Sequence, residues 1–242
     1  MEPGWYPDPF GNGLRWWDGQ TWTAHAAPAA PGFYQLDPHK DLGDERQAGR
    51  RASIAVVVAA LIGAVNEVVA AFTYGHYFRA TIDAARNANG TVDTIPTPPG
   101  VVVSELLTIA ALVAQIFVMI WLYRAAKFAR NAGLPARRDP VWAALGFLIP
   151  VVNFWFPYQV AADSFPYTDP NRRLAGWWWT WYLISTLSVF VVLVASGFST
   201  TIGVVIALIG TCTYALAAVY ARRMIVALGA AHEQLLVSFG RR

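Results

Sequence analysis

Apolar residues are concentrated in four long blocks, at about 53–78, 101–123, 176–198 and 201–220. Each block is about 20 residues long or longer and holds almost no charged side chain, and a helix of that length crosses the roughly 30 Å of hydrocarbon in a bilayer. The first block begins too far from the N-terminus, and is too long, to be a signal peptide. The pattern predicts an all-α polytopic membrane protein with four transmembrane helices.

A fifth apolar stretch, residues 141–160, is interrupted by Pro150, Asn153 and Pro157. Two prolines remove two backbone donors, and carbonyl groups left unpaired in lipid are costly. We therefore expect a proline-broken segment that does not cross the membrane. The sequence leaves two forms open, a re-entrant segment buried against protein and a segment lying at the membrane interface.

The Lys and Arg residues beside the apolar blocks are unevenly distributed. If the broken segment returns to the side on which it begins, 11 of them lie on one side and only Arg79 and Arg86 lie on the other. If it crosses the membrane, the distribution becomes 7 against 6. Positive residues gather on the cytoplasmic side of membrane proteins, so we expect four spans in the plasma membrane with both termini in the cytoplasm. The 11 residues are Arg50, Arg51, Arg124, Lys127, Arg130, Arg137, Arg138, Arg172, Arg173, Arg222 and Arg223.

Residues 1–27 differ from the rest of the chain because they combine closely spaced tryptophans with turn residues. Asp18-Gly19 is typical of a tight hairpin turn, in which both central positions need positive φ. The flanking residues 14–17 and 20–23 suit strands, and Pro7 and Pro9 favour an extended lead-in. We expect a small Trp-rich β-hairpin module of two or three strands, marginally stable at this size.

The remainder of the chain divides into three parts. Residues 28–49 contain several prolines and are expected to form a flexible linker. Residues 50–223 contain the four spans and the broken segment. Residues 224–242 are expected to form an amphipathic cytoplasmic tail, because Leu228, Ala231 and Leu235 recur near helical spacing.

Three motifs near the N-terminus carry a resemblance to a known module. They are Gly4-Trp5-Tyr6-Pro7-Asp8-Pro9, Arg15-Trp16-Trp17-Asp18-Gly19 and Trp22-Thr23. Together they resemble domain of unknown function 2510, a short actinobacterial module found at the N-terminus of membrane proteins, and the resemblance implies no activity.

Two interpretations of this module remain open. Its tryptophans form the core of a folded cap, or an exposed aromatic and proline surface binds an extended segment of a cytoplasmic or membrane protein partner. The candidate partner-binding residues are Trp5, Tyr6, Pro7, Pro9, Trp16, Trp17 and Trp22.

The membrane block carries a second resemblance, over about residues 50–223. Its motifs are 121–126 with 131–134, 139–143, 149–159 and 177–179. They resemble the membrane family of domain of unknown function 4328, which likewise implies no activity. Phe156 stands where that family often has an arginine, so an anion-binding role at that position does not carry over.

Glu67 is an acidic residue within the first apolar block. It lies on a stripe of small residues that recur every four positions, at Ala59, Gly63 and Ala71, so it should face other helices. By counting 1.5 Å per residue, Thr108 of the second block lies at about the same depth and is the expected partner. An intramembrane carboxylate suggests either a packing role or a proton- or cation-linked role in a small transporter or channel-like protein.

Composition excludes several other classes of protein. With 56% hydrophobic and 14% charged residues, the chain is not an ordinary soluble enzyme. The net charge of +3 comes from residues that flank spans, so no nucleic-acid partner is indicated. The four histidines are scattered without metal-ligand spacing, and no catalytic motif, metal site or cofactor site is recognised.

Five cations follow the second apolar block. Two roles remain open. The cations anchor the spans, with long side chains reaching the interface, or they bind anionic lipid headgroups. They are Arg124, Lys127, Arg130, Arg137 and Arg138.

The sequence thus favours a non-enzymatic integral inner-membrane protein that presents a cytoplasmic Trp-rich module to a protein partner. The alternative is the small transporter built around Glu67. The lipid bilayer is the other partner of the chain, and whether it forms a homo-oligomer is left open.

Overall fold

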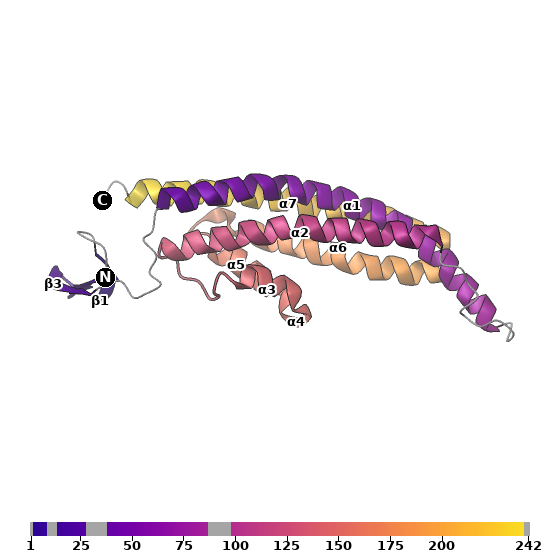
Figure 1. Cartoon of the computed structure of the whole chain (residues 1–242), viewed down its shortest axis with the longest axis horizontal. Coiled ribbons are helices and arrows are strands. Elements are labelled where there is room, and N and C mark those ends of the chain that lie inside the picture. Colours follow the sequence, from indigo (N-terminus) through magenta and orange to yellow (C-terminus); the bar gives the residue numbers. More distant parts are fainter. Residues whose placement is uncertain (1, 9–13, 28–37, 87–97, 240–242) are drawn as a thin grey trace. The chain divides into compact units, whose positions relative to one another are not determined.

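The computed structural model describes residues 2–8, 14–27, 38–86 and 98–239, and the chain divides into two compact units, Met1–Asp41 and Leu42–Arg242. Each unit is described by itself. Figure 1 shows the small sheet of the first unit and the long helices of the second.

The N-terminal unit contains a three-stranded antiparallel sheet in the order β1-β2-β3. Its strands are β1 (Gly4–Pro7), β2 (Leu14–Trp17) and β3 (Trp22–Ala27). The predicted turn joins β2 to β3, with Gly19 at φ 101°. The Asp18 carboxylate accepts hydrogen bonds from the backbone N–H groups of Thr21 (2.6 Å) and Gln20 (2.7 Å), which hold the pKa of Asp18 below its ordinary value.

Four long helices form the membrane unit, and all four are long and apolar enough to cross a membrane, as the sequence predicts. They are α1 (Pro38–Arg86), α2 (Pro99–Asn131), α6 (Arg173–Phe198) and α7 (Thr200–Phe239). Ser199 alone separates α6 from α7, in an extended conformation, and these two helices pack along each other. The chain is thus a multi-pass membrane protein with a helical bundle.

Two of these helices extend beyond the apolar blocks. Residues 38–49, the second half of the expected linker, belong to α1, and the expected separate tail is a continuation of α7 as far as Phe239. Residues 28–37 and 240–242 lie outside the described residues. The expected start of the first helix and end of the last one were therefore wrong. Each helix continues because it buries a face beyond its hydrophobic block, with Leu42 and Ala48 buried on α1 and Met224 and Leu228 buried on α7.

The proline-broken stretch forms three short helices, α3 (Trp142–Leu148), α4 (Pro150–Asn153) and α5 (Phe156–Asp163). Pro150 and Pro157 lie in the first turns of α4 and α5, where a backbone N–H would have no acceptor within the helix, so its absence in proline costs nothing. Helices α3 and α5 pack against each other, since a Cβ at Gly146 would lie 3.2 Å from Phe156 and Pro157.

A short 3-10 turn, η2 (Pro170–Arg172), leads from this segment into α6. Packing between the segment and the long helices completes the principal core, which contains Trp121, Phe165, Trp178 and Met224. The indole N–H of Trp179 on α6 donates to the backbone carbonyl of Phe154 at 2.8 Å and so fixes the link between α4 and α5.

Candidate functional site

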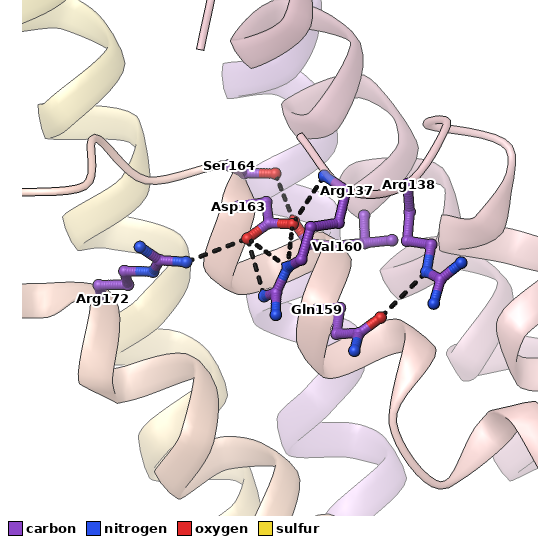
Figure 2. A network of polar contacts seen from close by, with 7 residues as sticks. All are labelled: Arg137, Arg138, Gln159, Val160, Asp163, Ser164 and Arg172. Carbon is purple, nitrogen blue, oxygen red and sulfur yellow. Dashed lines mark hydrogen bonds and ion pairs between the residues drawn. The ribbon is translucent and has the colours of Figure 1, made fainter. Parts of the chain in front are cut away.

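The carboxylate of Asp163, the last residue of α5, is the centre of a charged network. Its side chain is only 5% exposed. It accepts hydrogen bonds from Arg137 through the backbone N–H (3.0 Å), Nε (2.9 Å) and Nη2 (2.9 Å), and from Nη2 of Arg172 (3.0 Å). Figure 2 shows the two guanidinium groups approaching the carboxylate from opposite sides.

This network joins the two ends of the proline-broken segment. Arg137 precedes α3 and Asp163 ends α5, so the chain between them must leave one place and return to it. The hydrogen bonds to Asp163 raise the pKa of Arg137, so its guanidinium group stays charged. The segment is therefore a hairpin, which explains why it does not act as a fifth span.

A second network lies in the core next to the first. His232 of α7 is completely buried, and the side chain of Glu45 on α1 is 2% exposed. His232 Nδ1 lies 2.7 Å from Oε2 of Glu45, and its Nε2 lies 2.8 Å from the backbone carbonyl of Ser164. The imidazole thus connects α1, α7 and the residue that follows Asp163.

The two hydrogen bonds of His232 define how many protons the pair holds. A carbonyl oxygen only accepts, so Nε2 must carry a proton and donate it to Ser164. One further proton lies between Nδ1 and the Glu45 carboxylate, either on the imidazole or on the acid. In both states the pair has zero net charge, which is the form compatible with complete burial.

Sequence reasoning missed this pair because its members are 187 residues apart. A signal was nevertheless present. Glu45 occupies the same helical face as Leu42 and Ala48, and His232 comes one turn after Leu228, so each polar residue interrupts a buried apolar stripe.

Most of the five candidate lipid-binding cations are paired with other side chains of the same chain, at partly exposed positions. Arg124 pairs with Asp44 at 2.7 Å, Arg130 pairs with Asp139, and Arg137 pairs with Asp163. Lys127 lies one turn after Arg124 on α2.

Arg138, the last of the five, donates to the side-chain oxygen of Gln159 at 3.0 Å (Figure 2). It also stacks over the ring of Phe156, with its guanidinium carbon 4.0 Å from the ring centre. Phe156 thus supports the guanidinium group of Arg138. Binding of anionic lipid by these cations stays a prediction, and it would compete with their internal partners.

In the N-terminal sheet, the strand register determines which of the candidate aromatic residues pack together. Trp17 is paired with Trp22 and the two rings pack 5.2 Å apart, while Tyr6 packs edge-on against Trp22 at 6.1 Å. Trp16 stands across from Trp5 in the neighbouring strand. Pro7, the last residue of β1, pairs with Leu14 in the register, and Pro9 lies outside the described residues.

One side of the sheet therefore carries an aromatic face, defined by Tyr6, Trp17 and Trp22, in which every ring is only partly buried. Beside it, Arg15 donates to both carboxylate oxygens of Asp8, at 2.8 and 3.0 Å. This two-point bond raises the pKa of Arg15 and ties β2 to the residue after β1.

Glu67 is 2% exposed, and neither carboxylate oxygen has a hydrogen-bond partner within hydrogen-bonding geometry among the described residues. The expected pairing with Thr108 is wrong. The Thr108 hydroxyl accepts from the side-chain N–H of Asn66 at 3.0 Å, whereas Glu67 packs against Gly210 of α7. Depth along the bundle was estimated correctly, but adjacent residues of a helix point about 100° apart, so only Asn66 faces α2.

Comparison with known proteins agrees with both resemblances. Residues 3–35 match the family described as Protein of unknown function (DUF2510). Residues 99–230, which include α2, the hairpin, α6 and much of α7, match the Domain of unknown function (DUF4328). No curated protein and no solved structure matches the chain. Because the second match covers more than half of the chain, this membrane protein belongs to the DUF4328 family.

Proposed function

We propose that this protein is a non-enzymatic component of the plasma membrane that presents its N-terminal sheet to a protein partner in the cytoplasm. The observation that carries the proposal is the aromatic face of Tyr6, Trp17 and Trp22. Its three rings keep part of their surface exposed. Partly exposed aromatic residues are the usual anchors of protein interfaces.

The chemistry of this face favours a particular kind of partner. Flat rings with exposed edges bind extended segments that carry proline or aliphatic side chains, because such segments lose little conformational entropy on binding. Beside this face, the charged side chains of Arg15 and Asp8 are paired with each other. We therefore expect an extended, apolar or proline-containing segment rather than a charged motif.

The arrangement of the membrane unit supports a cytoplasmic location for the sheet. With four spans and a hairpin closed by Arg137 and Asp163, the large majority of the flanking cations share one side with both termini. The positive-inside rule assigns that side to the cytoplasm.

Crosslinking followed by affinity capture from native membranes tests this proposal. The full chain is compared with a chain lacking residues 1–30, with Trp17→Ala, and with Gln20→Ala as a control in the exposed turn. We expect the truncation and Trp17→Ala to lose a specific partner that Gln20→Ala keeps. An unchanged set of partners in all four samples would contradict the proposal.

Glu67 favours a second function, proton- or cation-linked transport. A buried carboxylate with both oxygens unpaired is costly in a membrane and is by default a functional-site hypothesis. In vesicles containing the purified protein, transport predicts an ion-dependent flux that Glu67→Gln abolishes while the fold is kept. If the wild-type protein carries no flux, or if the flux survives the substitution, transport through Glu67 is excluded.

A further inference from the structure

A cavity of about 300 Å³ lies among the four long helices, in the part of the bundle formed by the apolar blocks. All four helices contribute to its wall. On α1 the lining extends from Val56 to Asn66, which corresponds to about 15 Å along the helix axis, so the cavity is elongated. Its volume is at the lower end of the range for small-molecule sites.

The cavity opens sideways, between α2 and α6. Among the residues that line it, those with exposed side chains are Thr108 and Leu112 of α2 and Thr186 of α6. The walls supplied by α1 and α7 are buried or half-buried. Because these helices lie within the membrane, the opening faces lipid, and a ligand would enter from the bilayer.

Two polar atoms in the cavity wall are buried without a hydrogen-bond partner among the described residues. They are the side-chain oxygen of Asn66, an acceptor, and the side-chain nitrogen of Gln115, a donor. The side-chain nitrogen of Asn66 donates to the Thr108 hydroxyl, so the unpaired atom of Asn66 is its side-chain oxygen. In hydrocarbon an unpaired polar group is strongly unfavourable, which favours a partner that comes from outside the protein.

The wall also defines the charge of that partner. None of the described residues that line the cavity is charged. An ionised headgroup would lose its hydration without gaining a counter-charge, which is strongly unfavourable. The Asn66 oxygen requires a hydrogen-bond donor, and the Gln115 nitrogen requires an acceptor. Thr108, which is bonded to Asn66, lies seven residues from Gln115 on α2. By helix rise, the two polar positions are therefore about 10 Å apart along the bundle.

We infer that this cavity binds the head of an uncharged, single-chain lipid such as a monoacylglycerol. A hydroxyl group of the head donates to Asn66, and a carbonyl oxygen further along accepts from Gln115. The volume accommodates one small head and not a diacyl lipid, and the acyl chain leaves past Leu112 into the bilayer.

The test uses the full-length protein in lipid nanodiscs that contain a trace of a monoacylglycerol with a photoactivatable diazirine in its acyl chain. After illumination, labelled peptides are identified by mass spectrometry. We expect labelling near Leu112 and Thr186 that saturates and that excess unlabelled monoacylglycerol displaces. A photoactivatable phosphatidylglycerol, which is anionic and has two chains, should label lipid-facing positions without saturation.

Variants separate the cavity from the general lipid-facing surface. Asn66→Leu and Gln115→Leu should each weaken binding about tenfold, as expected for loss of one buried hydrogen bond. Gln234→Leu makes the same change at an exposed position outside the cavity and should have no effect. Ala111→Leu fills the cavity without removing a polar group and should also block labelling. This variant tests the cavity even if a variant that removes a polar group fails to fold.

Labelling that does not saturate, that is equal for the two lipids, or that survives Gln115→Leu and Ala111→Leu would overturn the inference. In that case the two polar atoms are satisfied by water alone.

Discussion

Arg137 and Asp163 lie 26 residues apart in the chain, and their side chains meet in a two-point ion pair at the place where the proline-broken hairpin begins and ends. The hairpin is therefore closed by charge as well as by packing. Arg172, at the start of α6, adds a second guanidinium to the same carboxylate, so the pair also sets where the third span begins.

Removing the carboxylate should destabilise the hairpin. Asp163→Ala leaves two guanidinium groups facing each other without a counter-charge, and we expect a loss of about 1–3 kcal/mol, reduced from the value for a fully buried pair because both arginines keep contact with water. Thermal unfolding of the full chain in nanodiscs measures the loss. Glu233→Gln, which removes an exposed pair with Arg46, is the matched control and should change stability by less than about 0.5 kcal/mol. Equal effects of the two variants would show that the Asp163 network does not hold the hairpin.

Asp139 should make stability depend on pH in the acid range. Its carboxylate accepts from the backbone N–H of Val141, 3.1 Å away at the start of α3, and pairs with Arg130, and both contacts lower its pKa below the ordinary value of 3.8. A lowered pKa contributes stability above pH 3.8, and this contribution is lost as the pH falls through the folded-state pKa.

The difference in melting temperature between wild type and Asp139→Asn isolates this contribution from other carboxylates. We expect the variant to be less stable at pH 7 and the difference to shrink towards pH 3 and below. A difference that is constant with pH would rule out the titration of Asp139 as its origin.

The buried pair of Glu45 and His232 should behave as one unit. Glu45→Leu leaves an imidazole in the core without its proton-sharing partner, and His232→Leu leaves a buried carboxylate, so each should cost about 3–5 kcal/mol. The double variant should cost clearly less than the sum of the two, because it leaves neither group unpaired. Additive losses in a double-mutant cycle would mean that the two residues contribute independently.

The side chain of Glu67 fills the space next to Gly210. A Cβ at this position would lie 2.6 Å from Oε1 of Glu67, so Gly210→Ala should destabilise the bundle by about 1–3 kcal/mol. Glu67→Ala in the same chain should recover most of the loss by removing the obstruction. Gly229→Ala on the same helix, where no atom lies within 4 Å, is the control and should be neutral or slightly stabilising. If Glu67→Ala does not restore the stability lost in Gly210→Ala, the clash with Glu67 is not the cause of the loss.

Patterns within short stretches of sequence predicted much of this fold. The four apolar blocks and the Asp18-Gly19 turn are local signals, and the positions of Pro150 and Pro157 were enough to indicate a broken segment. Helix ends were less predictable, since an apolar block marks where hydrocarbon ends and α1 and α7 continue beyond it.

Partners across the bundle were predicted least well. Counting residues gives the depth of Thr108 but not which of Asn66 and Glu67 faces it. The contact between Glu45 and His232 joins the first and last helices of the membrane unit, and only the interrupted apolar faces of the two helices hinted at it.

Cysteine labelling tests the topology on which the proposed function depends. In a Cys212→Ser background, single cysteines replace Gln20 in the sheet turn, Asp83 near the end of α1, Leu134 after α2 and Asn171 after the hairpin. A membrane-impermeant reagent added to intact cells should label only position 83, and permeabilised cells should show labelling at all four. External labelling of position 171 would mean that the broken segment crosses the membrane, and external labelling of position 20 would contradict the cytoplasmic location of the N-terminal sheet.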